Sequence, residues 1–194
     1  MGFRALNYLH NIASRLGKPP ARLAVIDRAL ANEGLRRKGT GRATPAPSLE
    51  EQITLLLAAT TAASPLCWHG NRKEPTVKEG PNEALIWSKL PCSGKGGDVF
   101  EEVRRETLGG TLEAIVSKIS RGGFERRDAM SLILNLTTDT ATIQLTDSDN
   151  EYLMFSSQQN TKPVDAETTV TIKGRYFVSL TTSSNAETLP DSFQ

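Results

Sequence analysis

The sequence predicts an α+β protein, with a helical N-terminal half followed by a helix and a small antiparallel sheet. Before residue 64, apolar residues recur every three or four positions, which is the period of an amphipathic helix. After Gly122-Gly123 they alternate, as in Leu132, Leu134 and Leu136, which is typical of a half-buried strand. The chain of 194 residues is 38% hydrophobic and 23% charged, so it can bury a core without a disulfide framework.

Local signals mark the ends of the N-terminal helices. Gly17 is expected to stop the first helix, because glycine tolerates the left-handed conformation of a C-terminal cap. Pro20 suits the first position of the second helix, where its missing N–H is no loss. Ser48 and Glu51 have the spacing of a capping box and should begin the third helix. The expected helices cover residues 3–16, 20–33 and about 49–63.

The rest of the chain divides by composition. Prolines and glycines interrupt residues 64–97, so we expect a linker there, with at most a short helical piece around residues 82–90. A further helix is expected from Asp98 to Ile119, weakened or split at Gly109-Gly110. The expected strands are 132–136, 141–145, 152–155 and 169–172, with 176–180 as a fifth strand or a continuation of the fourth. The predicted organisation is therefore a helical module at 1–63, a linker at 64–97, a helix-plus-sheet module at 98–180 and a flexible tail at 181–194.

Charge is distributed unevenly along the chain, although the net charge is only +1. Residues 1–47 contain nine basic and two acidic side chains. Residues 131–194 contain three basic and eight acidic side chains. This asymmetry favours a nucleic-acid-binding N-terminal end, while a solvated basic face without a partner is the plain alternative.

The basic region contains the residues that a helix-turn-helix needs. Ala13 is small enough for a close helix approach, and Gly17 follows four positions later in the turn. Leu23 and Ile26 have the spacing to pack the second helix against the first. On these four residues, the segment 12–30 resembles the helix-turn-helix DNA-binding regulators of bacteria, phages and mobile elements.

The resemblance implies that the second helix enters the major groove of double-stranded DNA. Its exposed positions would then be Ala21, Arg22, Val25, Arg28 and Asn32. Among these Arg22 is the first candidate for a base contact, because a guanidinium can pair with guanine through two hydrogen bonds. Phosphate contacts are expected from Arg15 and Lys18, and a flexible arm of Arg36, Arg37, Lys38 and Arg42 could follow the backbone or enter a minor groove.

Other motifs point only weakly to chemistry. Cys67, His69 and Cys92 lack the fourth ligand and the paired spacing of a structural zinc site. Neither thiol has an evident neighbouring group that would orient a base and make the cysteine a catalytic nucleophile. The segment 94–98 is glycine-rich but lacks the spacing of a phosphate-binding P-loop. Asp147, Asp149 and Glu151 do not have the twelve-residue arrangement of a calcium loop. We therefore expect no enzymatic activity, cofactor or metal.

The resulting hypothesis is a sequence-specific, DNA-binding transcriptional regulator that acts as a homodimer or higher homo-oligomer. No apolar run approaches the length of a membrane span and no signal peptide is recognisable, so a cytoplasmic protein without a membrane partner is expected. One alternative is a phage DNA-packaging protein similar to a small terminase subunit. The other is a structural protein whose N-terminal helices bind a protein partner.

Overall fold

The computed structural model describes residue 9 and residues 12–38, 47–61, 79–157 and 168–185. It confirms the predicted α+β class, with helices in the N-terminal part followed by a five-stranded antiparallel sheet. The helices are α2 (Pro20–Asn32), α3 (Leu49–Thr61), α4 (Glu79–Ser88), α5 (Leu108–Ser120) and α6 (Gly174–Asn185), with a short 3-10 helix, η2 (Arg127–Ala129). The strands are β1 (Cys92–Gly96), β2 (Met130–Asn135), β3 (Thr140–Leu145), β4 (Ser148–Ser156) and β5 (Thr169–Lys173).

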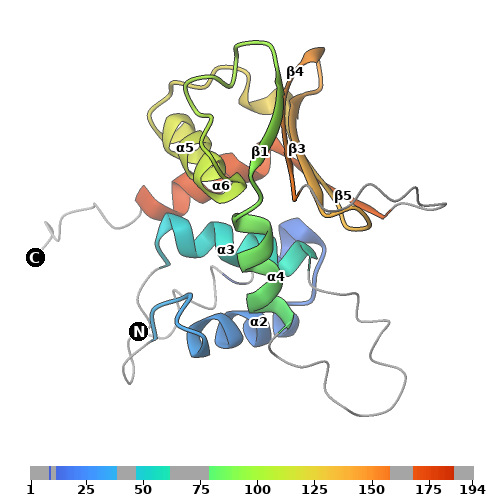
Figure 1. Cartoon of the computed structure of the whole chain (residues 1–194). Coiled ribbons are helices and arrows are strands. Elements are labelled where there is room, and N and C mark those ends of the chain that lie inside the picture. The colour runs from blue at the N-terminus through green and yellow to red at the C-terminus, as the bar shows by residue number, and fades with distance from the viewer. Residues whose placement is uncertain (1–8, 10–11, 39–46, 62–78, 158–167, 186–194) are drawn as a thin grey trace, which may run out of the picture.

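The sheet has the order β1-β4-β3-β2-β5, which leaves β1 and β5 as its two edges. The expected strands 132–136 and 141–145 are confirmed as the neighbours β2 and β3, since Leu132 pairs with Ile143 and Leu134 with Ala141. Helices α5 and α6 cover one face of the sheet, and the helices α2, α3 and α4 lie below it (Figure 1). Alternate side chains of β3 and β4 are buried, among them Ile143, Leu153 and Phe155.

One contiguous core joins the helical half to the sheet. It includes Leu23 and Leu56 from the helical half and Leu112 and Phe177 from the two helices on the sheet. The expected linker contributes to this core, because Trp87 of α4 is only 1% exposed. Residues 92–96 of the same segment form the edge strand β1, which pairs with β4. The short helical piece expected around residues 82–90 is therefore confirmed as α4, whereas the prediction of a linker is wrong for the strand at 92–96 and for the buried part of α4.

Three further predictions of local structure are wrong. The segment 176–180 is part of helix α6, because Tyr176, Phe177 and Leu180 are buried together at the i, i+1, i+4 spacing of a helix face. The same helix continues to Asn185, so residues 181–185 do not belong to a tail. Residues 98–106 form turns, and α5 begins only after Thr107, whose side chain accepts a hydrogen bond from the Gly110 N–H.

Candidate nucleic-acid interface

The turn before α2 has the geometry that the sequence predicts. Residues 12–16 are helical, and Gly17 follows with a φ of +61°, in the left-handed region. The Gly17 N–H donates to the Ser14 carbonyl at 3.3 Å, and the Lys18 N–H donates to the Ala13 carbonyl at 2.9 Å. These two bonds form a Schellman cap, which ends the helix and directs the chain into α2.

Helix α2 has one buried and one solvent-exposed face. Its apolar positions Leu23, Ile26, Ala29 and Leu30 are buried in the core. Val25 is 45% exposed, one of three large apolar side chains that are exposed in the described part of the chain. Figure 1 shows α2 at the outer end of the helical half, on the side away from the sheet. The exposed face consists of Ala21, Val25, Arg28 and Asn32, which are spaced three or four residues apart.

Arg22 does not belong fully to this exposed face. Its side chain is half-buried, and the guanidinium nitrogen Nη1 is inaccessible to solvent. A buried nitrogen cannot reach a base edge without a change of conformation. Arg28, which is exposed, therefore replaces Arg22 as the best-placed guanidinium on α2.

The expected flexible arm is fixed to the helices at its start. Arg36 is only 5% exposed and forms an ion pair with Asp27 of α2, with Nε 2.7 Å from Oδ1. A guanidinium held in this way is not available for phosphate binding, so the prediction that Arg36 belongs to a mobile cationic arm is wrong. The physical reason is that Asp27, nine residues earlier in the chain, binds the Arg36 guanidinium and holds it against α2.

Arg37 is also held, through Glu51 of α3. The Arg37 N–H donates to Oε1 of Glu51 at 2.6 Å, and its Nε lies 3.2 Å from the same oxygen. The other carboxylate oxygen accepts the Ser48 N–H at 2.6 Å, which completes the predicted capping box. Lys38 is exposed, and Arg42 lies outside the described residues.

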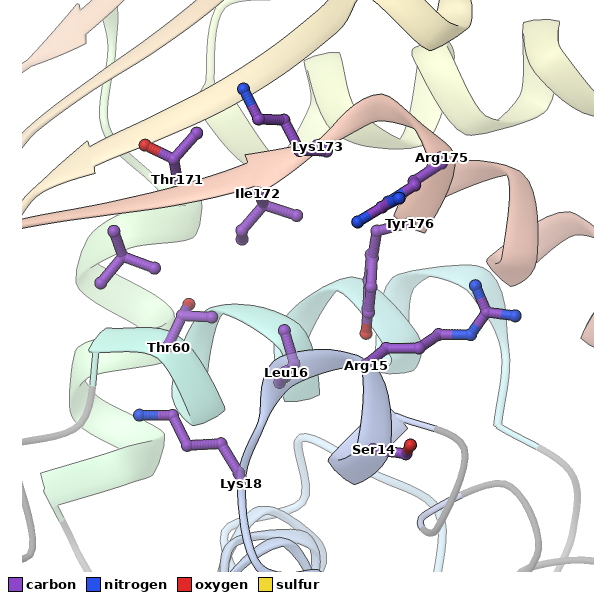
Figure 2. Close-up of a pocket in the computed structure, with 11 residues that line it drawn as sticks. Ser14, Arg15, Leu16, Lys18, Thr60, Thr171, Ile172, Lys173, Arg175 and Tyr176 are labelled. Atoms are coloured by element: carbon purple, nitrogen blue, oxygen red, sulfur yellow. The ribbon is translucent and has the colours of Figure 1, made fainter.

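Arg15 and Lys18 lie beside cations from the other end of the chain. Together with Lys173 and Arg175 they line a cavity of about 640 Å³ between the turn, α3, β5 and α6. Figure 2 shows the Tyr176 ring extending from α6 toward Arg15, and Ile172 extending from β5 toward Leu16. We call this cavity the basic pocket; its residues are Ser14, Arg15, Leu16, Lys18, Thr60, Val170, Thr171, Ile172, Lys173, Arg175 and Tyr176.

The sequence reasoning missed Lys173 and Arg175. They are two of only three basic residues among residues 131–194, which otherwise carry acidic charge. The available signal was the pairing of these two cations around Gly174 within an otherwise acidic stretch. Burial raises the pKa of the Tyr176 phenol far above its usual value, although the nearby Arg15 charge acts in the opposite direction. The phenol is therefore neutral at physiological pH.

The other motifs form no metal-binding group in the described part of the chain. No group of three His, Cys, Asp or Glu side chains in that part could hold a metal ion. Cys92 is a half-buried thiol that donates to the Gly94 carbonyl at 3.8 Å. Cys67 and His69 lie outside the described residues. The glycine-rich segment 94–98 belongs to β1 and the turn after it, not to the start of a helix.

Comparisons with known proteins add no assignment. No family model, curated protein or solved structure matches the chain. In the described residues no helix has the length and apolar character needed to cross a bilayer. The function must therefore be inferred from the geometry of α2 and the basic pocket.

Proposed function

We propose that this protein binds double-stranded DNA through α2 and acts as a sequence-specific transcriptional regulator. The observation that supports this most is the outer face of α2, where Val25, Arg28 and Asn32 are exposed on a helix preceded by a tight glycine turn. These side-chain types read base edges in the major groove: arginine reads guanine, asparagine reads adenine, and an apolar group contacts the thymine methyl. No carboxylate lies on this face.

Cations on both sides of α2 suit the phosphate backbone. Lys18 and Arg15 precede the helix, and exposed Lys38 follows it by six residues. The first turn of α2 has no acidic residue that would repel a phosphate. In this proposal these side chains fix the register of the protein on the duplex, while Arg28 and Asn32 discriminate bases.

The experiment that tests this proposal is selection of duplexes from a randomised pool, followed by anisotropy titrations on the enriched sequence and on a scrambled one. We expect the wild type to prefer the enriched sequence. The double variant Arg28→Ala/Asn32→Ala should lose this preference, by about 1–3 kcal/mol for each lost pairing, and keep its affinity for scrambled DNA.

The matched control removes two cations from elsewhere on the surface. Lys89→Ala/Arg121→Ala changes two exposed side chains that have no described ion pair, so preference and affinity should both remain. Absence of any enrichment, together with no binding at low salt, would exclude the DNA-binding proposal. If the double variant Arg28→Ala/Asn32→Ala still preferred the enriched sequence, residues outside this face of α2 would have to read the bases.

A single short recognition helix contacts few base pairs, so we propose that the protein acts as a dimer or higher oligomer on repeated half-sites. The enriched sequence tests this directly. We expect the enriched sequence to contain two half-sites about one helical turn apart. Sedimentation should then show two protein chains bound to each duplex. One unrepeated site bound by one chain would contradict it.

A further inference from the structure

The outer side of β5 is an edge of the sheet with unpaired backbone groups. Strand β5 lies at the end of the sheet beside β2, and the Leu136 N–H donates to the Thr168 carbonyl at 2.8 Å where the two strands meet. Because hydrogen-bonded pairs alternate in an antiparallel ladder, the N–H and C=O groups of Thr169 and Thr171 point away from β2. Within the described part of the chain, no residue hydrogen-bonds to these outward groups.

The opposite edge of the sheet, at β1, is partly covered. The Cys92 N–H donates to the Glu106 carbonyl at 2.9 Å, and Pro91 forms an isolated antiparallel bridge with Thr107. These contacts place the segment before α5 along the start of β1. An unpaired edge is a template for a further strand, so β5 is the edge at which another chain can pair.

The side chains of β5 define two sides for an added strand. Figure 2 shows Ile172 extending toward Leu16, while Thr171 and Lys173 extend from the other side of β5. Ile172 is only 3% exposed and lines the basic pocket, whereas Thr171 and Lys173 are exposed. Since side chains alternate along a strand, every second residue of an added strand would face the pocket beside Ile172 and Leu16. Apolar residues suit those positions.

The charges around this edge indicate the chemistry of the added strand. Lys18, Lys173 and Arg175 line the basic pocket, and none of them forms an ion pair with a described residue. Figure 2 shows their head groups apart from one another, with Lys173 on one side of β5 and Lys18 on the other. Cations spread along an edge are complementary to several carboxylates on an extended chain. A second copy of β5 would instead bring the same cations against each other.

We infer that the β5 edge binds an extended acidic segment of a partner protein, which adds to the sheet as a sixth strand. Its backbone hydrogen-bonds to Thr169 and Thr171, its alternate apolar side chains enter the basic pocket, and its carboxylates lie near Lys173 and Arg175. Binding at this edge does not depend on DNA binding by α2.

Hydrogen exchange of the free protein, followed by nuclear magnetic resonance, tests whether the edge is open. The N–H groups of Thr169 and Thr171 should exchange at least about tenfold faster than those of Val170 and Ile172, which pair with β2. Slow exchange of Thr171 at every protein concentration would mean that this chain already covers the edge. Slow exchange that appears only at high protein concentration would mean that a second copy covers it. Either result would overturn the inference.

The probe for binding is a short peptide of alternating glutamate and valine, blocked at both ends. It should slow the exchange of Thr169 and Thr171 and shift the resonances of β5. The same peptide with every backbone nitrogen methylated cannot donate hydrogen bonds, so we expect it to bind about tenfold more weakly or worse. A peptide of alternating lysine and valine should not bind, because its charges repel those of the edge. Equal binding of either control peptide would overturn the inference.

Two variants test the protein side of the same contacts. Lys173→Ala/Arg175→Ala changes two exposed side chains and should weaken binding of the glutamate–valine peptide about fivefold or more. Thr171→Pro removes an N–H that points away from β2, so the sheet should tolerate it while peptide binding falls. If Thr171→Pro does not fold, the methylated peptide tests the same hydrogen bonds on the wild type. The matched control Lys89→Ala/Arg121→Ala should bind the peptide as the wild type does.

The outcomes for the β5 edge and for DNA binding are separable. Peptide binding at β5 by a protein that does not bind DNA would support the edge site and exclude the proposed function. DNA binding by a protein that ignores the glutamate–valine peptide would overturn only the edge site.

Discussion

Arg36 and Asp27 form a buried ion pair that fastens the segment after α2 to the helix itself. Nε of Arg36 lies 2.7 Å from Oδ1 of Asp27, and Nη1 donates to Oδ2 at 3.0 Å. The two side chains are only 4% and 15% exposed. Burial raises the pKa of Asp27 above its usual value, and the Arg36 charge acts against this rise. Each of these two buried charges is therefore stabilised by the opposite charge of the other side chain.

Removal of one partner should cost more than removal of both. Arg36→Met leaves a buried carboxylate without its cation, so we expect a loss of about 3 kcal/mol in the free energy of unfolding. Asp27→Leu/Arg36→Met should recover at least half of that loss, because no charge remains buried. Urea unfolding followed by circular dichroism measures all three proteins.

Arg37→Met is the control for this pair, since the Arg37 side chain is 60% exposed. We expect it to cost less than about 1 kcal/mol, as exposed ion pairs do. If Arg36→Met proved as mild as Arg37→Met, the ion pair with Asp27 would have no structural importance.

Glu51 joins two segments through one carboxylate, and this predicts a pH dependence. Burial alone would raise its pKa, but the hydrogen bonds from Arg37 and Ser48 outweigh burial and lower the pKa below the usual 4.5. A lowered pKa in the folded state stabilises the protein above pH 4.5, and this stabilisation is lost as the pH falls through the lowered value.

Glu51→Gln should therefore reduce stability at neutral pH by about 2 kcal/mol, the value of a charge-assisted hydrogen bond. The difference between wild type and variant should shrink as the pH falls below 4.5. Thermal unfolding across this pH range measures the effect, with Glu125→Gln as the control at an exposed carboxylate. A difference that is independent of pH would assign the loss to packing instead of charge.

The features predicted correctly from the sequence are those decided by neighbouring residues. Ser48 and Glu51 form their capping box because both partners lie within one helical turn. Gly17 ends its helix because only the local backbone has to become left-handed. The hairpin of β2 and β3 is decided by alternation on both sides of a short turn.

The wrong predictions concern contacts that reach beyond one helical turn and depend on how the elements pack. The pattern of the loop after α2 gave no sign that Arg36 pairs with Asp27, because a salt bridge depends on tertiary packing. Lys173 and Arg175 line the same pocket as Arg15 only because β5 and α6 return the chain to the helical half. Residues 176–180 were expected to form a strand, whereas Tyr176, Phe177 and Leu180 are buried in helix α6.

Gly174 allows β5 to pass directly into α6, and substitution there should be costly. A Cβ at this position would lie 1.8 Å from the Arg127 carbonyl oxygen, so the backbone of η2 or α6 would have to move. We expect Gly174→Ala to cost about 3 kcal/mol, as overpacking at a rigid contact does. Because the displaced segment includes Tyr176, the variant should also change the resonances of the basic pocket.

Gly122→Ala separates backbone strain from this steric clash. Gly122 has a φ of +74°, and no atom lies within 4 Å of the Cβ that alanine would add. Its cost should be limited to the left-handed backbone, about 1–2 kcal/mol. If Gly174→Ala were no less stable than Gly122→Ala, the backbone of η2 would be able to move aside at little cost in free energy.

The cations on both sides of α2 predict how DNA binding depends on salt. Each phosphate that the protein neutralises releases condensed counterions, so the logarithm of the affinity falls with the logarithm of salt concentration. Lys18→Ala/Lys38→Ala should lower the magnitude of this slope by about 2 and weaken binding to enriched and scrambled duplexes alike. Anisotropy titrations at four or more salt concentrations measure the slope, with Lys89→Ala/Arg121→Ala as the control of equal charge change. An unchanged slope in Lys18→Ala/Lys38→Ala would mean that the phosphates contact another face, and a slope reduced equally by the control would mean that only net charge matters.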